Sequence, residues 1–289
     1  MQTNDHFIKD LDRRTFLMTA LVAPALAAAL AACGSTNKAA SNAIRHATGR
    51  EDLVLRIGYE GGFTAPSYQF VRVPTALISG DGRVIAAGVQ TEQFPGPLLP
   101  ALTERTITEA GIQRVLELAD AAKLLQPPPD YTAEMNVADA PDTVVTLTVN
   151  GQTYEHRAYA LGMTEPESTP ARKALAGFVT AMSDFATVAG AANLGGEGPL
   201  VAENYRIQAR VVTDADLAGY DQSIPPVKVA WPSGAGVGLA SASTCAVVAA
   251  PNVDAVLQAA TQMTFFTDNG VIYQVAAVAK LPGDTCVAG

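Results

Sequence analysis

The stretch 144–159 reads Val-Val-Thr-Leu-Thr-Val-Asn-Gly-Gln-Thr-Tyr-Glu-His-Arg-Ala-Tyr. Two runs rich in β-branched and aromatic residues, 144–149 and 153–159, flank the pair Asn150-Gly151. Asn-Gly is strongly preferred in two-residue hairpin turns, because both central residues of a type I′ turn need a positive φ. The stretch therefore predicts a β-hairpin and, with it, a sheet of antiparallel strands.

Residues on the N-terminal side of this hairpin predict further strands. Residues 52–60 alternate apolar and polar side chains, which is the pattern of a half-buried strand. The tight turn Gly80-Asp-Gly82 separates two strand-like runs, 68–78 and 83–87, and so predicts a second hairpin. Pro74 interrupts the first of these runs and indicates an edge or a bulge there.

Two helices are predicted to cover one face of this sheet. Thr106-Ile-Thr-Glu109 has the spacing of a capping box, and three prolines, Pro127–Pro129, prevent the helix from continuing. Thr169 and Pro170 provide an N-cap and a first helical residue for the second helix. In both segments apolar residues recur on one face at the helical period: Ile112, Val115, Leu116, Ala119 and Ala122, then Leu175, Phe178, Val179, Met182 and Phe185.

The C-terminal part has strand signals of its own. Four glycines lie in 190–199, which indicates a linker at 190–198 between a first lobe, 51–189, and a second lobe, 199–289. Asn252 is predicted to cap a helix that runs to about Thr264. We therefore expect an α+β fold of two lobes, with antiparallel strands and hairpins covered by about three helices. The strands expected in the second lobe are 205–212, 227–231, 245–249 and 271–278.

The N-terminus carries an export signal. The sequence Asp-Arg-Arg-Thr-Phe-Leu-Met at 12–18 begins an uncharged run of about 17 residues, which is short for a membrane span and contains Pro24. The arginine pair before an aromatic residue and a leucine resembles a twin-arginine (Tat) signal, so the resemblance implies recognition by the Tat translocase. The residues that carry it are Arg13, Arg14, Phe16 and Leu17.

Leu30-Ala-Ala-Cys33 ends this run and resembles a bacterial lipobox. The resemblance implies that Cys33 receives a diacylglyceryl group, that signal peptidase removes 1–32, and that Cys33 becomes the first mature residue. Two acyl chains suffice for stable anchoring, so the membrane is an expected partner. The following stretch, 33–50, has few large apolar residues and is expected to be a flexible tether.

Charge and cysteine content agree with an extracytoplasmic protein. The formal net charge is −9, and the signal carries equal numbers of acidic and basic residues, so nucleic acid is not an expected partner. The chain has three cysteines. Since Cys33 would be lipidated, Cys245 and Cys286 remain as a pair in an oxidising compartment, and a disulfide between them is expected.

Catalytic and metal sites have little support in the sequence. Of three histidines only His156 can lie in the folded part, where a packed or surface histidine is the simpler interpretation, and no Gly-x-Ser-x-Gly motif occurs. No metal site is expected with so few His and Cys ligands. The acidic residues Asp214, Asp216 and Asp221 do not complete a calcium loop, because Pro225 takes the place of its last ligand.

Two remaining patterns are compatible with chemistry. The glycine-rich stretch 233–238 follows a strand but precedes no clear helix, so we expect a mobile loop and not a phosphate site. Paired carboxylates could hydrolyse a glycosidic bond if two of them lay close together, which the sequence alone does not place. The candidates are Glu60, Glu92 and Asp142.

Several loop motifs together resemble a group of exported proteins of high-GC Gram-positive bacteria that carry no assigned activity. The likeness covers most of 52–286, supplies no catalytic residue, and is weakened by Ala-Lys-Leu-Pro at 279–282. The motifs are Gly-Asp-Gly-Arg-Val-Ile at 80–85, Phe-Pro-Gly-Pro-Leu-Leu-Pro at 94–100, Ala-Asp-Ala-Pro-Asp-Thr at 138–143, Trp231-Pro232 and Leu-Pro-Gly-Asp-Thr-Cys at 281–286.

The sequence therefore indicates a lipid-anchored protein on the extracytoplasmic face of the cell membrane, most simply a non-catalytic envelope or binding protein without a cofactor. Two alternatives stay open. The chain could be an extracytoplasmic hydrolase that uses paired carboxylates, or a docking subunit of a membrane complex with an envelope partner. A cleft with close carboxylates would favour the hydrolase, and a large exposed apolar patch would favour docking.

Overall fold

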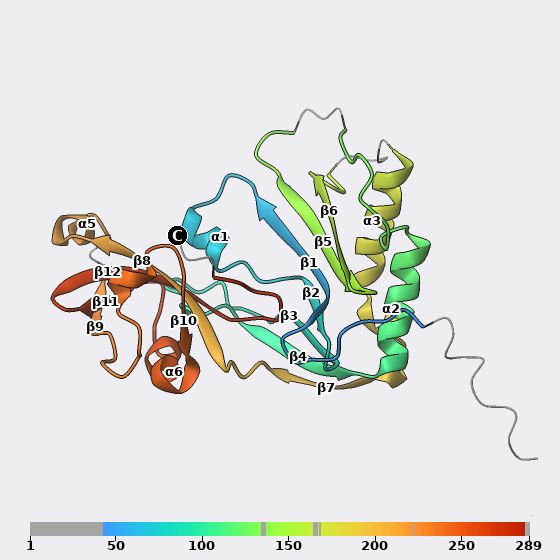
Figure 1. Ribbon diagram of the computed structural model, residues 1–289. Helices are drawn as coiled ribbons and strands as arrows, with labels where there is room; N and C mark the ends of the chain where they lie inside the picture. Colours follow the sequence, from blue (N-terminus) through green and yellow to red (C-terminus); the bar gives the residue numbers. More distant parts are fainter. Residues whose placement is uncertain (1–42, 134–136, 164–166, 168, 222, 287–289) are drawn as a thin grey trace, which may run out of the picture. The chain divides into compact units, whose positions relative to one another are not determined.

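The computed structural model describes residues 43–133, 137–163, 167, 169–221 and 223–286 (Figure 1). Residues Ala43–Gly289 form one compact unit. The predicted export signal, Cys33 and the first part of the expected tether lie outside the described residues. The structure confirms an α+β fold, with two sheets and helices packed on them.

The predicted hairpin lies at one edge of a seven-stranded antiparallel sheet. Asn150 and Gly151 have φ values of 53° and 75°, as the two-residue turn requires. The turn joins β5 to β6, and β1 pairs with β5 on its other side. The strand order is β6-β5-β1-β2-β3-β4-β7, with bounds β1 Leu53–Gly61, β2 Ala76–Ser79, β3 Arg83–Ala87, β4 Leu102–Ile107, β5 Pro141–Val149, β6 Gln152–Tyr159 and β7 Leu194–Pro199.

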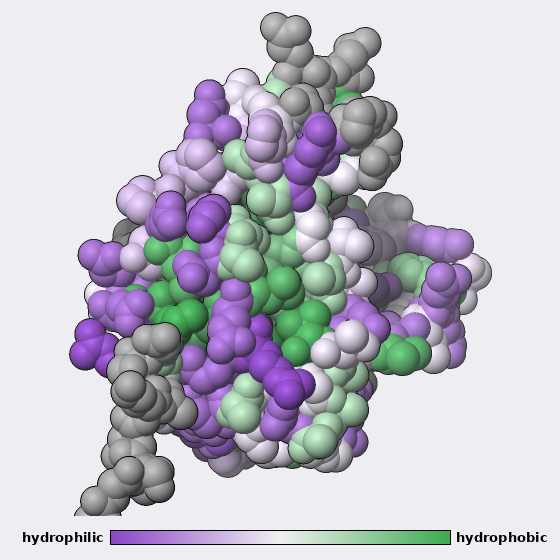
Figure 2. All heavy atoms as spheres, turned by 90° about the vertical axis from the view of Figure 1, so that its right-hand side faces the viewer, coloured by the Kyte–Doolittle hydropathy of each residue, from purple (hydrophilic) through white to green (hydrophobic). Residues whose placement is uncertain are grey.

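Helices α2 (Glu109–Ala121) and α3 (Pro170–Met182) cover one face of this sheet. Thr169 caps α3 as predicted, through its side-chain oxygen. The predicted cap of α2 is wrong by two residues, because β4 continues to Ile107 and Thr108 becomes the N-cap. Figure 2 looks at this side and shows apolar residues in its middle, bordered by polar ones.

The helices pack on one set of alternate strand residues, because successive side chains point to opposite faces of a sheet. Leu55, Ile57 and Val145 point to the helices and are buried with the apolar faces of α2 and α3. The largest helical side chains in this cluster are Leu116, Leu175 and Phe178. The predicted apolar positions thus form the main core of the first sheet.

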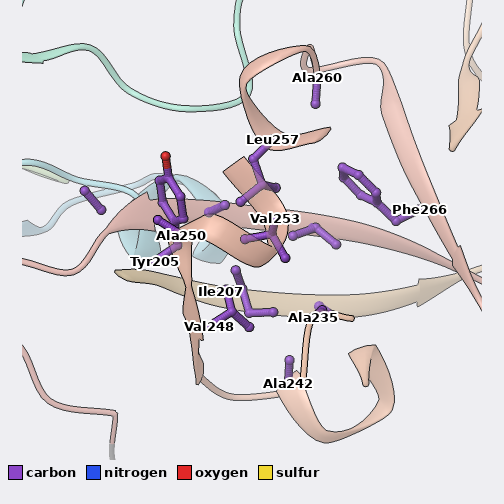
Figure 3. Packing of buried hydrophobic residues seen from close by; sticks show 14 of the residues in the cluster. Tyr205, Ile207, Ala235, Ala242, Val248, Ala250, Val253, Leu257, Ala260 and Phe266 are labelled. Carbon is purple, nitrogen blue, oxygen red and sulfur yellow. The ribbon is translucent and has the colours of Figure 1, made fainter. Parts of the chain in front are cut away.

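The second sheet has five strands and its own helix, α6 (Ala250–Gln258). Tyr205, Ile207 and Val248 pack against Val253 and Leu257 of α6 (Figure 3). Leu77, Ile85 and Leu102 from the helix-free face of the first sheet join this cluster. The order is β10-β8-β12-β11-β9, with β9 and β11 parallel, and the bounds are β8 Asn204–Val212, β9 Val227–Ala230, β10 Ala246–Ala249, β11 Thr264–Asp268 and β12 Val271–Ala279.

Short helices account for several differences from the predicted elements. The predicted strand 68–78 is mostly wrong, because α1 (Pro66–Phe70) takes up its start and only 76–79 pair as β2. Ala249, not Asn252, is the N-cap of α6, and the helix ends before β11 begins. The other short elements are α4 Phe185–Ala189, α5 Asp214–Ala218, η1 Ala191–Asn193 and η2 Leu239–Ala242.

The stretch predicted to be a linker is part of the first sheet. It forms η1 and the edge strand β7, which pairs with β4. Glycines suit this position because Gly195 lies so close to Thr106 that a Cβ atom would be 2.2 Å from its hydroxyl oxygen. The described end of the expected tether, 43–50, also contacts the folded unit: the Ile44 backbone bonds the Gln113 side chain.

Candidate functional site

The helix-free face of the first sheet is covered unequally. The second sheet packs over β2, β3 and β4, where Leu77, Ile85 and Leu102 are buried. Polar and charged side chains occupy this face on β1, β5 and β6, among them Arg56, Glu60, Asp142, Glu155 and Arg157. Figure 1 shows α1 between β1 and the strands β8 and β12 of the second sheet.

A hollow of about 480 Å³ lies where these parts meet. Its walls come from β1, β5, α1 with the segment after it, β8 and the C-terminal turn. The side chains that characterise it are three arginines, Arg56, Arg72 and Arg206, two carboxylates, Glu60 and Asp284, and the apolar or aromatic residues Tyr59, Phe70, Val73, Pro74 and Val144. Its volume lies within the range of small-molecule sites.

Asp284 holds two of these arginines together. Its Oδ1 atom is 2.7 Å from Nη1 of Arg56, and its Oδ2 atom is 3.1 Å from Nε of Arg206. The backbone N–H of Leu281 also donates to Oδ2, so the C-terminal turn fixes the carboxylate. A guanidinium from each sheet therefore meets one carboxylate, which is only 6% exposed.

Arg206 has an environment that disfavours its positive charge. Burial lowers its pKa, Asp284 opposes this effect, and the neighbouring Arg56 charge lowers the pKa further. Its guanidinium lies 5.3 Å from the ring centroid of Phe70 in α1, at cation–π distance. The side chain is on the face of β8 opposite Tyr205 and Ile207, which point into the core.

Arg72 follows α1 and forms another wall of the hollow. It lies 5.6 Å from the ring centroid of Tyr68, and its Nη2 donates to the hydroxyl of Thr64 over 3.1 Å. Its Nη1 atom is buried and has no hydrogen-bond partner. Arg72, Tyr59 and Val73 also line a second hollow of about 350 Å³, so the two spaces share a wall.

Two of the three candidate carboxylates lie together, but around an arginine. Glu60 and Asp142 are register partners on β1 and β5. Arg157 donates to Glu60 at 2.5 Å, to Asp142 at 3.1 Å and to Glu155 at 3.2 Å. The hydrogen bond to Glu60 contributes most to the raised pKa of Arg157, so the arginine stays charged beside them. Glu92 is exposed elsewhere in a loop.

His156 is a packed histidine, as predicted. Its side chain is fully buried, with Nε2 2.9 Å from the carbonyl oxygen of Leu124 and Nδ1 2.7 Å from the Tyr131 hydroxyl. Nε2 therefore donates to the carbonyl, and the Tyr131 hydroxyl donates to Nδ1. Burial lowers the pKa of His156, although the Leu124 carbonyl opposes this, and burial raises the pKa of Tyr131 to about 12. Both ring nitrogens have structural partners, so neither is free to act as a base.

The remaining sequence candidates have structural roles. Asp216 forms a capping box with Thr213 at α5, and Asp214 bonds Lys228. Asp221 accepts from the Ser223 amide. Within the described residues, no group of three or more His, Cys, Asp or Glu side chains could hold a metal ion. The glycine-rich stretch 233–238 is followed by Leu239, whose amide donates to the carboxylate of Asp268 at the end of β11. An anionic side chain therefore already contacts this loop.

Cys245 and Cys286 lie at disulfide-bonding distance, with Cα atoms 5.4 Å apart. Cys286 follows Asp284 by two residues, so this link is next to the arginine hollow. Arg13, Arg14, Phe16, Leu17 and Cys33 lie outside the described residues. In the described part of the chain, every helix is too short or too polar to cross a membrane.

Two other hollows are larger, but neither brings three arginines together. One of about 740 Å³ lies between α1 and the outer face of β8 and β12, and Arg210 is its one charged lining residue. The other, of about 530 Å³, is lined by Arg157 and Arg172 and by three carboxylates, Asp130, Asp142 and Glu155, so its acidic groups outnumber its basic ones. The hollow around Arg56, Arg72 and Arg206 is therefore the best candidate site.

None of these three arginines was predicted as a site residue from the sequence. Their positions are far apart, and each lies in a different local context: a strand, a segment after a short helix and a second strand. The one local signal was the alternation of β1, which places Arg56 on the face opposite Leu55 and Ile57. No protein-family model matches this chain, and no curated protein or solved structure matches it.

Proposed function

We propose that this chain is a lipid-anchored, extracytoplasmic binding protein that holds a ligand without transforming it. The observation that carries the proposal is the hollow in which Arg56, Arg72 and Arg206 meet apolar and aromatic walls. Concave, largely apolar sites with a few converging polar groups are typical binding sites. The groups that line it are guanidinium groups, carboxylates, the Thr146 hydroxyl, the Gln69 amide and apolar or aromatic side chains.

The anchoring part of the proposal is supported by the sequence. Arg13 and Arg14 would direct folded protein to the Tat translocase, and signal peptidase would cut before Cys33. A diacylglyceryl group on Cys33 would then hold the chain at the outer face of the membrane. The described residues begin at Ala43, ten positions after Cys33, so the folded domain would stay close to the membrane.

Anchoring is tested with Cys33→Ser expressed in a host that has the Tat and lipoprotein pathways. We expect loss of fatty-acid labelling and release of the protein from membranes. A matched pair, Arg13→Lys with Arg14→Lys, keeps the charge of the signal but should block export. Retention of unlabelled Cys33→Ser protein in the membrane would show that the apolar segment itself is the anchor, and normal export of the double-lysine protein would contradict the Tat route.

A second candidate function, hydrolysis by paired carboxylates, is favoured by the register pairing of Glu60 with Asp142. Arg157 donates a hydrogen bond to each of them, so both carboxylates are already engaged by one guanidinium instead of facing each other across an open space. Binding without catalysis is therefore the better interpretation. Hydrolysis of a polysaccharide that is lost in both Glu60→Gln and Asp142→Asn would reverse this preference.

A further inference from the structure

We propose that the hollow between the two sheets binds an oxyanion, a carboxylate or a phosphate, carried on an apolar or aromatic body. The inference rests on the proposed binding function and names the class of ligand. Three guanidinium groups and two carboxylates, Asp284 and Glu60, line the hollow. Arg157, outside the lining, already bonds Glu60. The hollow therefore has excess positive charge in a chain whose net charge is −9.

An unsatisfied donor points to the same place. In the described part of the chain, Nη1 of Arg72 is buried and has no hydrogen-bond partner. Buried donors without a partner are uncommon and costly in a folded protein. Arg72 lines this hollow beside Arg56 and Arg206. An oxyanion bound there would accept a hydrogen bond from this donor.

The pair Arg56 and Arg206 shows which chemistry fits. The two guanidinium groups already meet the carboxylate of Asp284, one at each oxygen. A guanidinium has five N–H donors in a planar fork, which matches the oxygen atoms of carboxylates and phosphates. Asp284 occupies only a part of this donor set. The donors that remain, together with those of Arg72, suit a second anionic group of similar geometry.

The apolar walls indicate what the anion is attached to. Phe70 and Tyr68 stack beside Arg206 and Arg72, which shields those charges from water on one side. Tyr59, Val73 and Pro74 add apolar surface along the lining. Inorganic phosphate alone would leave this surface unused, whereas an aromatic or acyl group would cover it. We therefore expect an organic anion to bind more tightly than the inorganic ion.

Calorimetric titration of the mature lipidated protein in neutral detergent tests the inference. The probes are phenyl phosphate and benzoate. Phenol is the uncharged control, and inorganic phosphate is the anion without an organic group. We expect both aromatic anions to bind more tightly than either control. Arg72→Met, which keeps an apolar stem, should weaken their binding about tenfold, because it removes charge-assisted hydrogen bonds. The affinity of Arg72→Lys for the aromatic anions should lie between that of the wild type and that of Arg72→Met.

The matched control is Arg210→Met, an exposed arginine on the same face of β8 as Arg206. It should bind the probes like the wild type, and a second variant, Arg206→Met, should lose binding if its melting temperature shows that it is folded. Equal binding of phenol and phenyl phosphate, or equal loss in Arg210→Met and Arg72→Met, would overturn the inference. So would the absence of binding by both aromatic anions.

Flotation of the unlipidated Cys33→Ser protein with vesicles separates two sources of the anion, because this variant has no acyl chains that would insert into any vesicle. Binding to phosphatidylglycerol vesicles but not to phosphatidylcholine vesicles, with competition by phenyl phosphate, would assign the site to a lipid headgroup. Binding of phenyl phosphate without such flotation would assign it to a soluble organic anion. Failure of the inference is distinguishable from failure of the proposed function, because anchoring is measured through Cys33→Ser and not through the hollow.

Discussion

Arg172 and Arg157 belong to the two opposite sides of the first sheet, and each is bonded to carboxylates. Arg172 of α3 is completely buried, lies 2.6 Å from Glu167 and donates to the backbone carbonyls of Tyr131 and Tyr159. Arg157 of β6 has three carboxylate partners, but its side chain is 40% exposed. The first arginine therefore has much less water around it than the second.

From this difference we expect burial to decide how much each arginine contributes to the stability of the fold. Burial raises the pKa of the Glu167 carboxyl, but the hydrogen bonds from Arg172 and from the Gly162 amide keep that pKa below its ordinary value. Removing one partner of a buried pair leaves an uncompensated charge, whereas exposed pairs gain little over water. The face of the first sheet that α2 and α3 cover is therefore expected to determine the stability of the fold. The helix-free face on β1, β5 and β6, called the open face below, is available for binding.

The largest effect is expected for Arg172→Met. The change leaves Glu167 and the carbonyls of Tyr131 and Tyr159 without their donor, and should lower the free energy of unfolding by about 3–5 kcal/mol. Urea denaturation followed by circular dichroism measures it. A loss below about 1 kcal/mol would show that water replaces the guanidinium, and the contrast between the two faces would then be wrong.

Cys286→Ser is expected to have the next largest effect and to act on the side of the open face. A link that closes a loop across 41 residues contributes about 4 kcal/mol in the chain-entropy model, less any native strain. The variant should melt earlier and exchange amide hydrogens faster near Asp284 than in α2. Wild-type protein with reductant is the matched control. Identical melting of the oxidised and reduced wild type would contradict this prediction.

The pH dependence of stability should follow His156 on the covered side. Burial lowers its pKa below the ordinary value of 6.5, so near and below pH 6.5 the unfolded chain binds a proton that the folded chain does not. Its contribution to stability is complete above pH 6.5 and is lost as the pH falls toward the pKa of the folded state. In His156→Gln the slope of unfolding free energy against pH should be smaller there. An unchanged slope would exclude this histidine as its source.

The smallest effect is expected for Arg157→Met, the counterpart of Arg172→Met. Its three exposed ion pairs should together contribute about 1 kcal/mol or less, and the difference from wild type should shrink in high salt. The same denaturation measurement in low and high salt checks both points. A loss as large as that of Arg172→Met would show that the cluster on the open face is itself a structural core.

Local sequence patterns were enough to predict several of the elements of the fold. The Asn150-Gly151 turn, the cap at Thr169 and the apolar face of α2 were all predicted from short-range rules, because each depends on residues close in sequence. The expected linker was wrong for the same reason. Its glycines allow flexibility locally, but pairing with β4 makes the segment an edge strand, and no local rule contains that partner.

The sequence by itself determined the antiparallel hairpins, the buried faces of the main helices, the acidic net charge and the pairing of the two cysteines that remain after Cys33. The proposed location rests on export and lipidation signals that are predicted from the sequence alone. Only the tertiary structure decided that β1, the segment after α1, β8 and the C-terminal turn meet at one hollow. Arg56, Arg206 and Asp284 are separated by long stretches of chain, and their contact depends on how two sheets pack. Alternation along a strand specifies which side chains share a face, but not which distant element comes to cover that face.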